Sequence, residues 1–210
     1  MEFKKIHLTG FKSFAEKTNF LIENGLTGIV GPNGCGKSNI VEALRWCMGE
    51  TSAKSMRGSG MEDVIFSGTS NKPSKNIAEV SINLSNKNKD GPYQYKELDK
   101  IEIKRKIEKD KGSKFYINDK EVRAKDAQMF FADLSTGAHS PSIISQGRIG
   151  SLVTAKPTDR RAILEEAAGI AGLHARRHEA ELRLGAAENN LKRADELRRQ
   201  QEKQLINLQK

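Results

Sequence analysis

The stretch Gly31-Pro32-Asn33-Gly34-Cys35-Gly36-Lys37-Ser38 fits the pattern G-x-x-x-x-G-K-[ST] of a phosphate-binding loop. An apolar run over residues 26–30 precedes it, and a helical pattern over residues 39–48 follows it. We therefore expect a buried strand, the glycine loop and a helix, in the order that such a loop needs to bind phosphate. The glycines let successive backbone N–H groups point at phosphate oxygens, and the helix adds the positive end of its dipole.

The residue types within the loop indicate a site for ATP and Mg²⁺. Lys37 would reach the β- and γ-phosphates, and the hydroxyl of Ser38 would ligate Mg²⁺. Asn33 and Asn39 are expected to support the loop and a Mg²⁺-bound water. The other residues expected to surround the phosphates are Pro32, Gly34, Cys35 and Gly36. The alternative, a chance glycine-rich turn, is disfavoured because the whole motif stands in register between suitable flanks.

Length and composition limit the other possibilities. A chain of 210 residues can bury one sizeable core, or form one domain with an extension. No apolar stretch near Met1 is long enough for a signal peptide or a membrane span, so we expect a cytoplasmic protein that does not enter a membrane. Reduced thiols suit Cys35 and Cys47 better than a disulfide, which would lock the loop. The net charge of +9 favours a polyanionic partner, nucleic acid first, over a generic basic surface.

The composition of the chain changes near residue 157. Before that point the sequence is mixed α/β, and afterwards glycine is rare and Ala, Leu, Glu, Arg and Gln dominate. Of the eight positions spaced three and four apart from Leu184 to Leu208, six are apolar, and such a heptad seam is typical of a coiled coil. We expect an N-terminal lobe over residues 1–157 and a neck with the start of a coiled coil over residues 158–210. Within the lobe we expect strands over 3–9, 18–22, 77–84 and 101–107, a hairpin over 115–122 and a short helix over 127–134.

Two motifs of complete nucleotide hydrolases are missing from the sequence. No apolar strand that ends in Asp-Glu follows the loop, and no Asn-Lys-x-Asp motif for guanine occurs. The segment Leu134-Ser135-Thr136-Gly137 is superficially similar to the signature motif of ABC-type ATPases, but it lacks the second glycine. We therefore expect the chain to carry half of an ATPase site.

Six motifs in order resemble the N-terminal head of the structural maintenance of chromosomes (SMC) ATPases, and most closely the bacterial chromosome-condensation form. The motifs are Gly10-Phe11-Lys12-Ser13-Phe14, the phosphate loop, Ser52-Ala53-Lys54-Ser55-Met56-Arg57-Gly58, Met61-Glu62-Asp63-Val64-Ile65-Phe66, Ile144-Ser145-Gln146-Gly147-Arg148-Ile149 and Leu164-Glu165-Glu166-Ala167-Ala168-Gly169. The resemblance implies an α/β fold, namely half of an ABC-type P-loop ATPase head with a mixed sheet and helices, followed by a long coiled-coil helix. It also implies that the missing motifs lie in a C-terminal half of the same head.

The resemblance implies several partners and roles for particular residues. The partners are a second head, so that the protein is a homodimer, double-stranded DNA at the nucleoid, and a kleisin subunit on the neck helix. Gln146 would ligate Mg²⁺ and sense the γ-phosphate, and Arg57 would approach the nucleotide phosphates, so that Lys37, Gln146 and Arg57 form the catalytic set. Lys12 would border the nucleotide. The plainer alternatives are a surface glutamine at 146 and a solvated arginine at 57.

The densest basic stretch runs from Lys100 to Lys125, and we expect it to face DNA. Arg123 and Lys125 match a Val-Arg-x-Lys-Asp pattern that the family uses on its DNA-facing surface, and Arg105 lies in the same stretch. Basic side chains on a rigid sheet can track a phosphate backbone without contacting bases. The alternative is a solvated edge strand protected by lysines.

Four functions compete, and the motifs at residues 54–58 and 165–169 argue against the second of them, whereas the third would need an acceptor site and a lid that the sequence does not show. The first is the ATP-binding half of an SMC ATPase for chromosome condensation and segregation, inactive without its other half. The second is the head of a DNA-repair ATPase of the same superfamily, and the third is a self-sufficient P-loop kinase. The fourth is a structural module whose neck helix holds a partner. On that helix Leu182 and Leu197 lie off the seam, either as part of a kleisin site or as residues that merely flank the seam.

Overall fold

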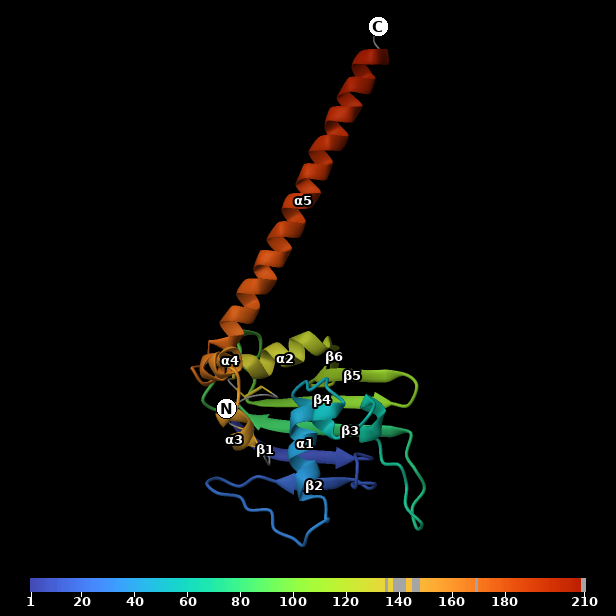
Figure 1. The fold of residues 1–210 in the computed structure, drawn as a ribbon, viewed down its shortest axis with the longest axis vertical. Coiled ribbons are helices and arrows are strands. Elements are labelled where there is room, and N and C mark those ends of the chain that lie inside the picture. Colours follow the sequence, from blue (N-terminus) through green and yellow to red (C-terminus); the bar gives the residue numbers. More distant parts are fainter. Residues whose placement is uncertain (135, 138–142, 145–147, 169, 209–210) are drawn as a thin grey trace. The chain divides into compact units, whose positions relative to one another are not determined.

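The computed structural model describes residues 1–134, 136–137, 143–144, 148–168 and 170–208 (Figure 1). The chain divides into two compact units, Met1–Ala171 and Gly172–Lys210. The predicted division into a lobe over residues 1–157 and a neck with the start of a coiled coil over residues 158–210 stays a prediction.

The first unit contains a sheet that is six-stranded in the described residues, in the order β2-β1-β3-β4-β5-β6, and every neighbouring pair is antiparallel. Each strand predicted in the segments 3–9, 18–22, 77–84, 101–107 and 115–122 overlaps an observed one. The strands are β1 (Glu2–Thr9), β2 (Thr18–Leu21), β3 (Ile77–Ser85), β4 (Lys100–Glu108), β5 (Gly112–Ile117) and β6 (Lys120–Val122).

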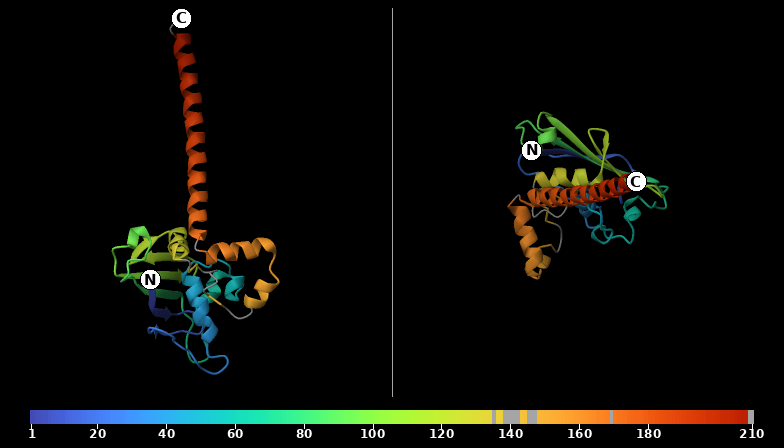
Figure 2. Two further views of the ribbon diagram at one scale, coloured as in Figure 1. Left: turned by 90° about the vertical axis from the view of Figure 1, so that its left-hand side faces the viewer. Right: turned by 90° about the horizontal axis from the view of Figure 1, so that it is seen from above.

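Alternation along β3 and β4 creates one apolar face of the sheet. Ile82 pairs with Ile103 in the antiparallel register, and both side chains are fully buried. Two helices cover this face, α1 (Lys37–Cys47) against β3 and β4 and α2 (Ala124–Asp133) against β5 (Figures 1 and 2). Their buried residues join the strands in a single core, to which the helices contribute Ile40, Ala43, Trp46, Cys47, Phe130 and Phe131.

Short helices make up most of the remaining structure of the first unit. Single 3₁₀ turns are η1 (Lys54–Met56), η2 (Met61–Val64) and η3 (Tyr93–Tyr95). Two α-helices, α3 (Arg148–Val153) and α4 (Pro157–Ala167), precede the second unit. The predicted helices over 39–48 and 127–134 are confirmed as α1 and α2, each beginning two or three residues earlier than expected.

The predicted buried strand over residues 26–30 is wrong. The segment has no strand conformation, and Leu26 and Val30 are 98% and 93% exposed. A strand needs neighbours for its backbone N–H and C=O groups, and no strand among the described residues pairs with this segment. An apolar sequence alone therefore does not make a strand here.

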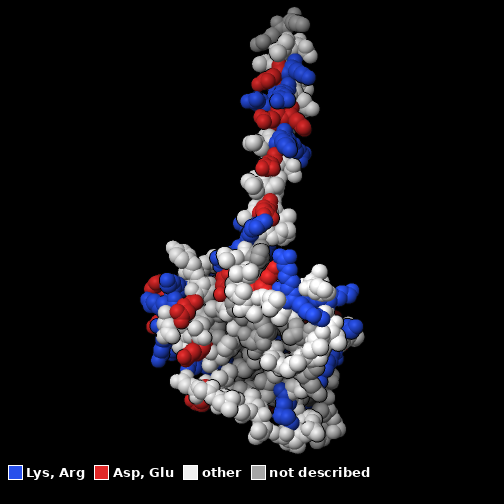
Figure 3. Space-filling model, turned by 60° about the vertical axis from the view of Figure 1, so that its left-hand side comes forward, with Lys and Arg blue, Asp and Glu red and all other residues white. Residues whose placement is uncertain are grey.

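The second unit is one long helix, α5 (Ala171–Leu208), whose first residue belongs to the preceding unit. Leu184, Leu191 and Leu205 of the predicted seam are exposed on it. Charges of both signs follow one another along its surface (Figure 3), and some pair one turn apart, as Arg177 does with Glu181 at 2.8 Å. Among the described residues no helix is long and apolar enough to cross a membrane.

Candidate nucleotide-binding site

The N-terminus of α1 is built to receive an anion. Gly36 is the N-cap residue with a φ of 91°, and Gly34 has a φ of 83°, both in the left-handed region that glycine adopts without strain. No side chain caps the helix, and its first turn holds no acidic residue. In the first turn the N–H of Asn39 donates to the carbonyl oxygen of Gly36 at 2.9 Å. The N–H groups that precede it have no carbonyl group within the helix to bind, so they can bind phosphate oxygens.

Close packing around the glycines explains why larger residues are excluded. A Cβ atom added to Gly36 would lie 2.5 Å from the Oγ of Ser13, and one added to Gly31 would lie 2.8 Å from the Sγ of Cys35. At Gly34 a Cβ would meet nothing within 4 Å, so its positive φ is what favours glycine there. The chemistry and shape of the loop therefore fit a nucleotide phosphate.

Lys37 crosses its own loop. Its Nζ donates hydrogen bonds of 2.6 Å to the carbonyl oxygens of Gly31 and Pro32, and it lies 3.7 Å from the Sγ of Cys35. These acceptors are neutral, whereas hydrogen bonds between a cation and an anionic phosphate are markedly stronger. A phosphate bound in the loop could therefore replace these carbonyl oxygens as the hydrogen-bond partner of the Lys37 ammonium group.

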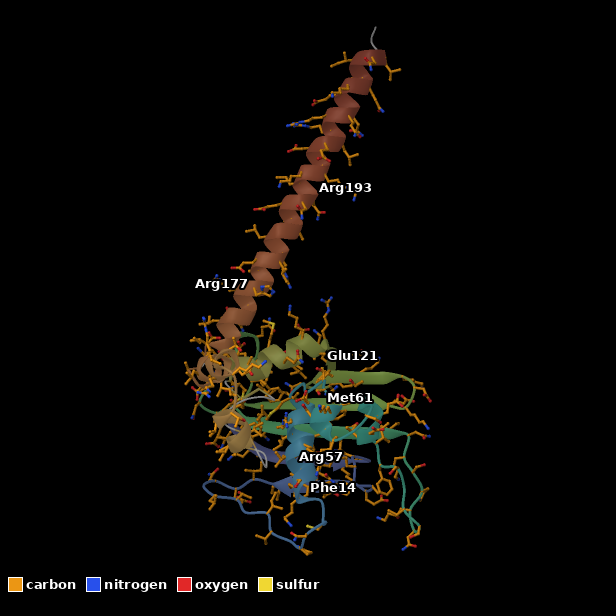
Figure 4. The ribbon with its side chains drawn as sticks, viewed as in Figure 1. Phe14, Arg57, Met61, Glu121, Arg177 and Arg193 are labelled. Atoms are coloured by element: carbon orange, nitrogen blue, oxygen red, sulfur yellow. The ribbon has the colours of Figure 1, made fainter. Side chains whose placement is uncertain are left out.

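Arg57 lies beside α1 (Figure 4), although its backbone belongs to the segment after η1. Its Nε bonds to the Oε1 of Glu42 at 2.5 Å, and its Nη2 donates to the Oδ1 of Asn39 at 2.9 Å. Asn39 in turn donates to the Oγ of Ser13 at 2.9 Å. Two side chains of the phosphate-loop helix therefore orient the arginine that sequence reasoning placed near the phosphates.

Lys12 binds the other oxygen of the Glu42 carboxylate. Its Nζ bonds to the Oε2 of Glu42 and to the carbonyl oxygen of Met56, and its backbone N–H donates to the carbonyl of Val64 at 2.7 Å. Lys12 therefore binds α1 at Glu42, one helical turn after Ser38, and also binds the segment that carries Arg57. Its predicted contact with the nucleotide stays a prediction.

A second carboxylate stabilises the segment after Arg57. The Oδ2 of Asp63 accepts the backbone N–H groups of Ser59 and Gly60 at 2.6 and 2.9 Å, and also the hydroxyl of Ser59. The Gly60 N–H and then the Ser59 groups hold the pKa of the Asp63 carboxyl below its usual value. The hydrogen bonds to Asp63 thus hold the backbone of the loop between η1 and η2.

A cavity of about 330 Å³ runs along α1 from the loop. Ser38, Glu42 and Arg45 recur at helical spacing on one face of α1 and form one wall, and Arg57 contributes to the other. The remaining lining residues are Val41, Ser55 and Ile144. Gln146, the predicted ligand of Mg²⁺, lies outside the described residues, as does His139.

The predicted DNA-facing residues separate into two groups. Arg123 and Lys125 are exposed at the start of α2, and Arg123 lines a groove of about 840 Å³ beside the β5–β6 hairpin. Arg105 is only 3% exposed, because it stands on the inward face of β4 and donates to the carbonyl oxygens of Trp46 and Glu50. The assignment of Arg105 to the DNA surface is therefore wrong.

Sequence reasoning missed Glu42 and Ser13 as parts of this site. Glu42 stands four residues after Ser38 within a helix whose neighbours Ile40, Ala43 and Cys47 are buried. An acidic residue next to such a buried face was the available signal, since a carboxylate is seldom buried without a cationic partner. Nothing in the sequence identified which cations those would be.

This arrangement of glycine loop, helix and antiparallel sheet matches one class of protein, the N-terminal part of an ABC-type ATPase head. The family model for the RecF/RecN/SMC N terminal domain matches residues 2–147, so the chain belongs to that family. The fold class predicted from the sequence, half of such a head followed by a long helix, is confirmed.

Individual relatives agree with this assignment. The chain is 54% identical over 210 residues to the Chromosome partition protein Smc of Rhodopseudomonas palustris. The match covers 100% of this chain and 18% of that relative. The chain thus spans less than a fifth of the length of the curated relatives that it matches.

Solved structures show the same head. An Smc head domain with an extended coiled coil from Pyrococcus furiosus, bound to the C-terminal domain of ScpA, is 33% identical with a TM-score of 0.74 and covers 93% of this chain and 48% of that one. A chain from a study of ATP-driven dimerization and DNA stimulated activation of SMC ATPases is 31% identical with a TM-score of 0.70, over 80% of this chain and 99% of that one.

Proposed function

We propose that this chain is the ATP-binding half of an SMC ATPase head that organises chromosomal DNA. The observation that carries the proposal is the uncapped N-terminus of α1 behind a left-handed glycine loop, with Lys37 across the loop and Arg57 held beside the same helix. A C-terminal half would add the acidic and signature motifs, and two such heads would engage on ATP. The protein would act in the cytoplasm, at the nucleoid.

The roles of the residues follow from where they lie. The N–H groups of residues 34–38 would bind the phosphates, with Pro32, Asn33 and Cys35 shaping the loop. Lys37 would exchange its carbonyl partners for phosphate oxygens, and Ser38 and Gln146 would hold Mg²⁺. When bound, Mg²⁺ neutralises charge on the phosphates. Arg57 would stabilise negative charge that develops there, for which a guanidinium is well suited.

Two surfaces would serve the partners. Arg123 and Lys125 would contact the backbone of double-stranded DNA without regard to sequence. The neck helix α5 would pair with the returning coiled-coil strand and hold a kleisin subunit. Support for a kleisin comes from the related Smc head domain that was solved with the C-terminal domain of ScpA.

The decisive experiment compares ATP hydrolysis by residues 1–210 alone and together with the C-terminal half. Alone, the chain should bind nucleotide but hydrolyse ATP at the background rate, since the acidic residues that activate water are expected in the other half. Addition of that half should restore turnover. Lys37→Ala should weaken nucleotide binding by about 1.5–3 kcal/mol, the value of a charge-assisted hydrogen bond. Robust turnover by the chain alone, abolished by Lys37→Ala, would refute the half-site proposal.

A further inference from the structure

Glu42 is a buried carboxylate in the middle of α1 that binds two cations from two different segments. Its side chain is 11% exposed, its Oε2 accepts from Lys12, and its Oε1 accepts from the Nε of Arg57. Burial of an unpaired charge is strongly unfavourable, so the position of this carboxylate depends on both partners. The three side chains therefore form one unit, which we call the Glu42 cluster.

The Glu42 cluster is attached to the phosphate-loop helix. Glu42 follows Ser38 by one helical turn, and the two residues line the same cavity. The Lys12 and Arg57 side chains that Glu42 binds are therefore positioned relative to the Ser38 hydroxyl on the same helix. Their positions are not set only by the loops in which they stand. The cluster carries two cations and one anion, so a net positive charge remains beside the site proposed for the phosphates.

Two bonds from α1 fix the orientation of the Arg57 guanidinium. Glu42 holds its Nε and Asn39 holds its Nη2, so the planar group cannot rotate freely. Its side chain is nevertheless 60% exposed, which leaves other N–H groups accessible. An oriented but accessible donor is what electrostatic stabilisation of a reacting phosphate requires.

Both cations of the Glu42 cluster stand at tight turns of the backbone. Lys12, with a φ of 47°, lies between the bridge partners Phe11 and Phe14, and Arg57, with a φ of 56°, is the C-cap residue of η1. The two turns thus send their side chains to one carboxylate.

We propose that Glu42 is a positioning residue: it holds Arg57, with Lys12 as its counterion, in the orientation in which Arg57 acts on the nucleotide phosphates. The proposal rests on the proposed function, because it needs ATP at the loop. Glu42 itself touches no nucleotide. It spares Arg57 the reorganisation that would otherwise accompany the reaction, so its removal should reduce turnover more than binding.

The test uses this chain with the C-terminal half that completes the head. Glu42→Gln keeps the shape of the side chain and removes its charge. It should lower kcat by about tenfold, as expected for an interaction that matters mainly in the transition state. The Kd for a non-hydrolysable ATP analogue, measured by calorimetry, should change by less than about threefold, because every phosphate contact is retained. Glu97→Gln, which breaks an exposed ion pair to Lys89, is the control and should change neither value.

A double-mutant cycle separates positioning from general damage. In an Arg57→Ala background Glu42→Gln should change kcat by less than about twofold, because Glu42 acts through Arg57. An equal fall in both backgrounds, a rise in kcat, or a loss of analogue binding that matches the loss of kcat would overturn the proposal. If Glu42→Gln unfolds the chain, Lys12→Met is added to remove the cation that has lost its carboxylate partner, and the effects with and without Arg57 are then compared in that background.

The proposed function has its own control in the same experiment. If Lys37→Ala leaves analogue binding intact, the loop is not the nucleotide site, and the proposed function fails together with the role of Glu42. If Lys37→Ala weakens binding as expected while the cycle is additive, only the role of Glu42 is overturned.

Discussion

The guanidinium of Arg105 stacks 4.5 Å from the centroid of the Trp46 ring and donates a 2.7 Å hydrogen bond to the Trp46 carbonyl oxygen. A second bond of 2.7 Å reaches the carbonyl oxygen of Glu50, and the guanidinium also lies 4.6 Å from the centroid of the Phe115 ring. Carbonyl groups at a helix C-terminus carry partial negative charge, which a cation stabilises. Arg105 thereby ties the C-terminal end of α1 to β4, while the N-terminal end of α1 carries the phosphate loop.

The first prediction is that Arg105→Met lowers the free energy of unfolding by about 3 kcal/mol, because two buried carbonyl groups lose a charged donor. Urea denaturation of residues 1–210, followed by circular dichroism, measures this change. Lys106→Met removes the same charge one residue along β4, from the opposite face of the sheet, and should change stability by less than about 0.5 kcal/mol. Weaker DNA binding by Arg105→Met at unchanged stability would contradict the structural role.

Local pattern explains what could be predicted from the sequence. Period-two alternation located β3 and β4, and the glycine loop located the start of α1, because both signals lie within one segment. The same alternation places Arg105 between Ile103 and Ile107 on the inward face, but its charge outweighed its position in our expectation. The apolar run over residues 26–30 was assigned to a strand without knowledge of which strand would pair with it.

The Glu42 cluster could not be predicted, for a different reason. Lys12, Glu42 and Arg57 come from three segments that only the folded chain brings together. Sequence reasoning selected the two cations through motifs, but it had no means to find the carboxylate that both of them bind. Contacts of this kind depend on tertiary packing, which a local pattern does not specify.

The second prediction concerns the two thiols. Burial raises the pKa of the Cys47 thiol to about 12, whereas Cys35 is exposed in the phosphate loop. Iodoacetamide should therefore label Cys35 in the native chain, and Cys47 only on unfolding. Since the usual thiol pKa is near 9.0, the unfolded chain releases this proton first, and stability from this group should fall as the pH rises above that value.

Mass spectrometry of the labelled peptides follows the two thiols separately. Cys35→Ser is the matched control, which should leave the native chain without rapid labelling. ATP with Mg²⁺ should slow the labelling of Cys35 if the loop binds phosphate. Equal rates for both thiols in the folded chain would show that Cys47 is not protected.

The third prediction concerns DNA. Arg123→Glu with Lys125→Glu should weaken binding of duplex DNA by the completed head, and to a similar degree for every sequence. By counterion release, the slope of log K against log salt should become shallower by about 0.9 for each phosphate contact that is lost. Lys17→Glu with Lys72→Glu makes the same change of charge at exposed positions outside the basic stretch and serves as the control. An unchanged slope for the first pair, or an equal change for both pairs, would place the DNA site elsewhere.

The last prediction concerns the neck helix α5. Leu182 and Leu197 are 60% and 53% exposed and lie off the heptad seam that contains Leu184 and Leu191. A two-stranded coiled coil buries its seam and has no use for a second apolar stripe, whereas a kleisin helix added as a bundle would bury it. Leu182→Glu with Leu197→Glu, in a protein that contains both coil strands, should therefore abolish co-purification of the kleisin and leave the coil folded. Leu184→Glu with Leu191→Glu should instead destabilise the coil itself and lower its melting temperature, because these residues face the partner strand. If the kleisin still binds when Glu stands at 182 and 197, the two leucines merely flank the seam, and the kleisin must contact another face of the helix.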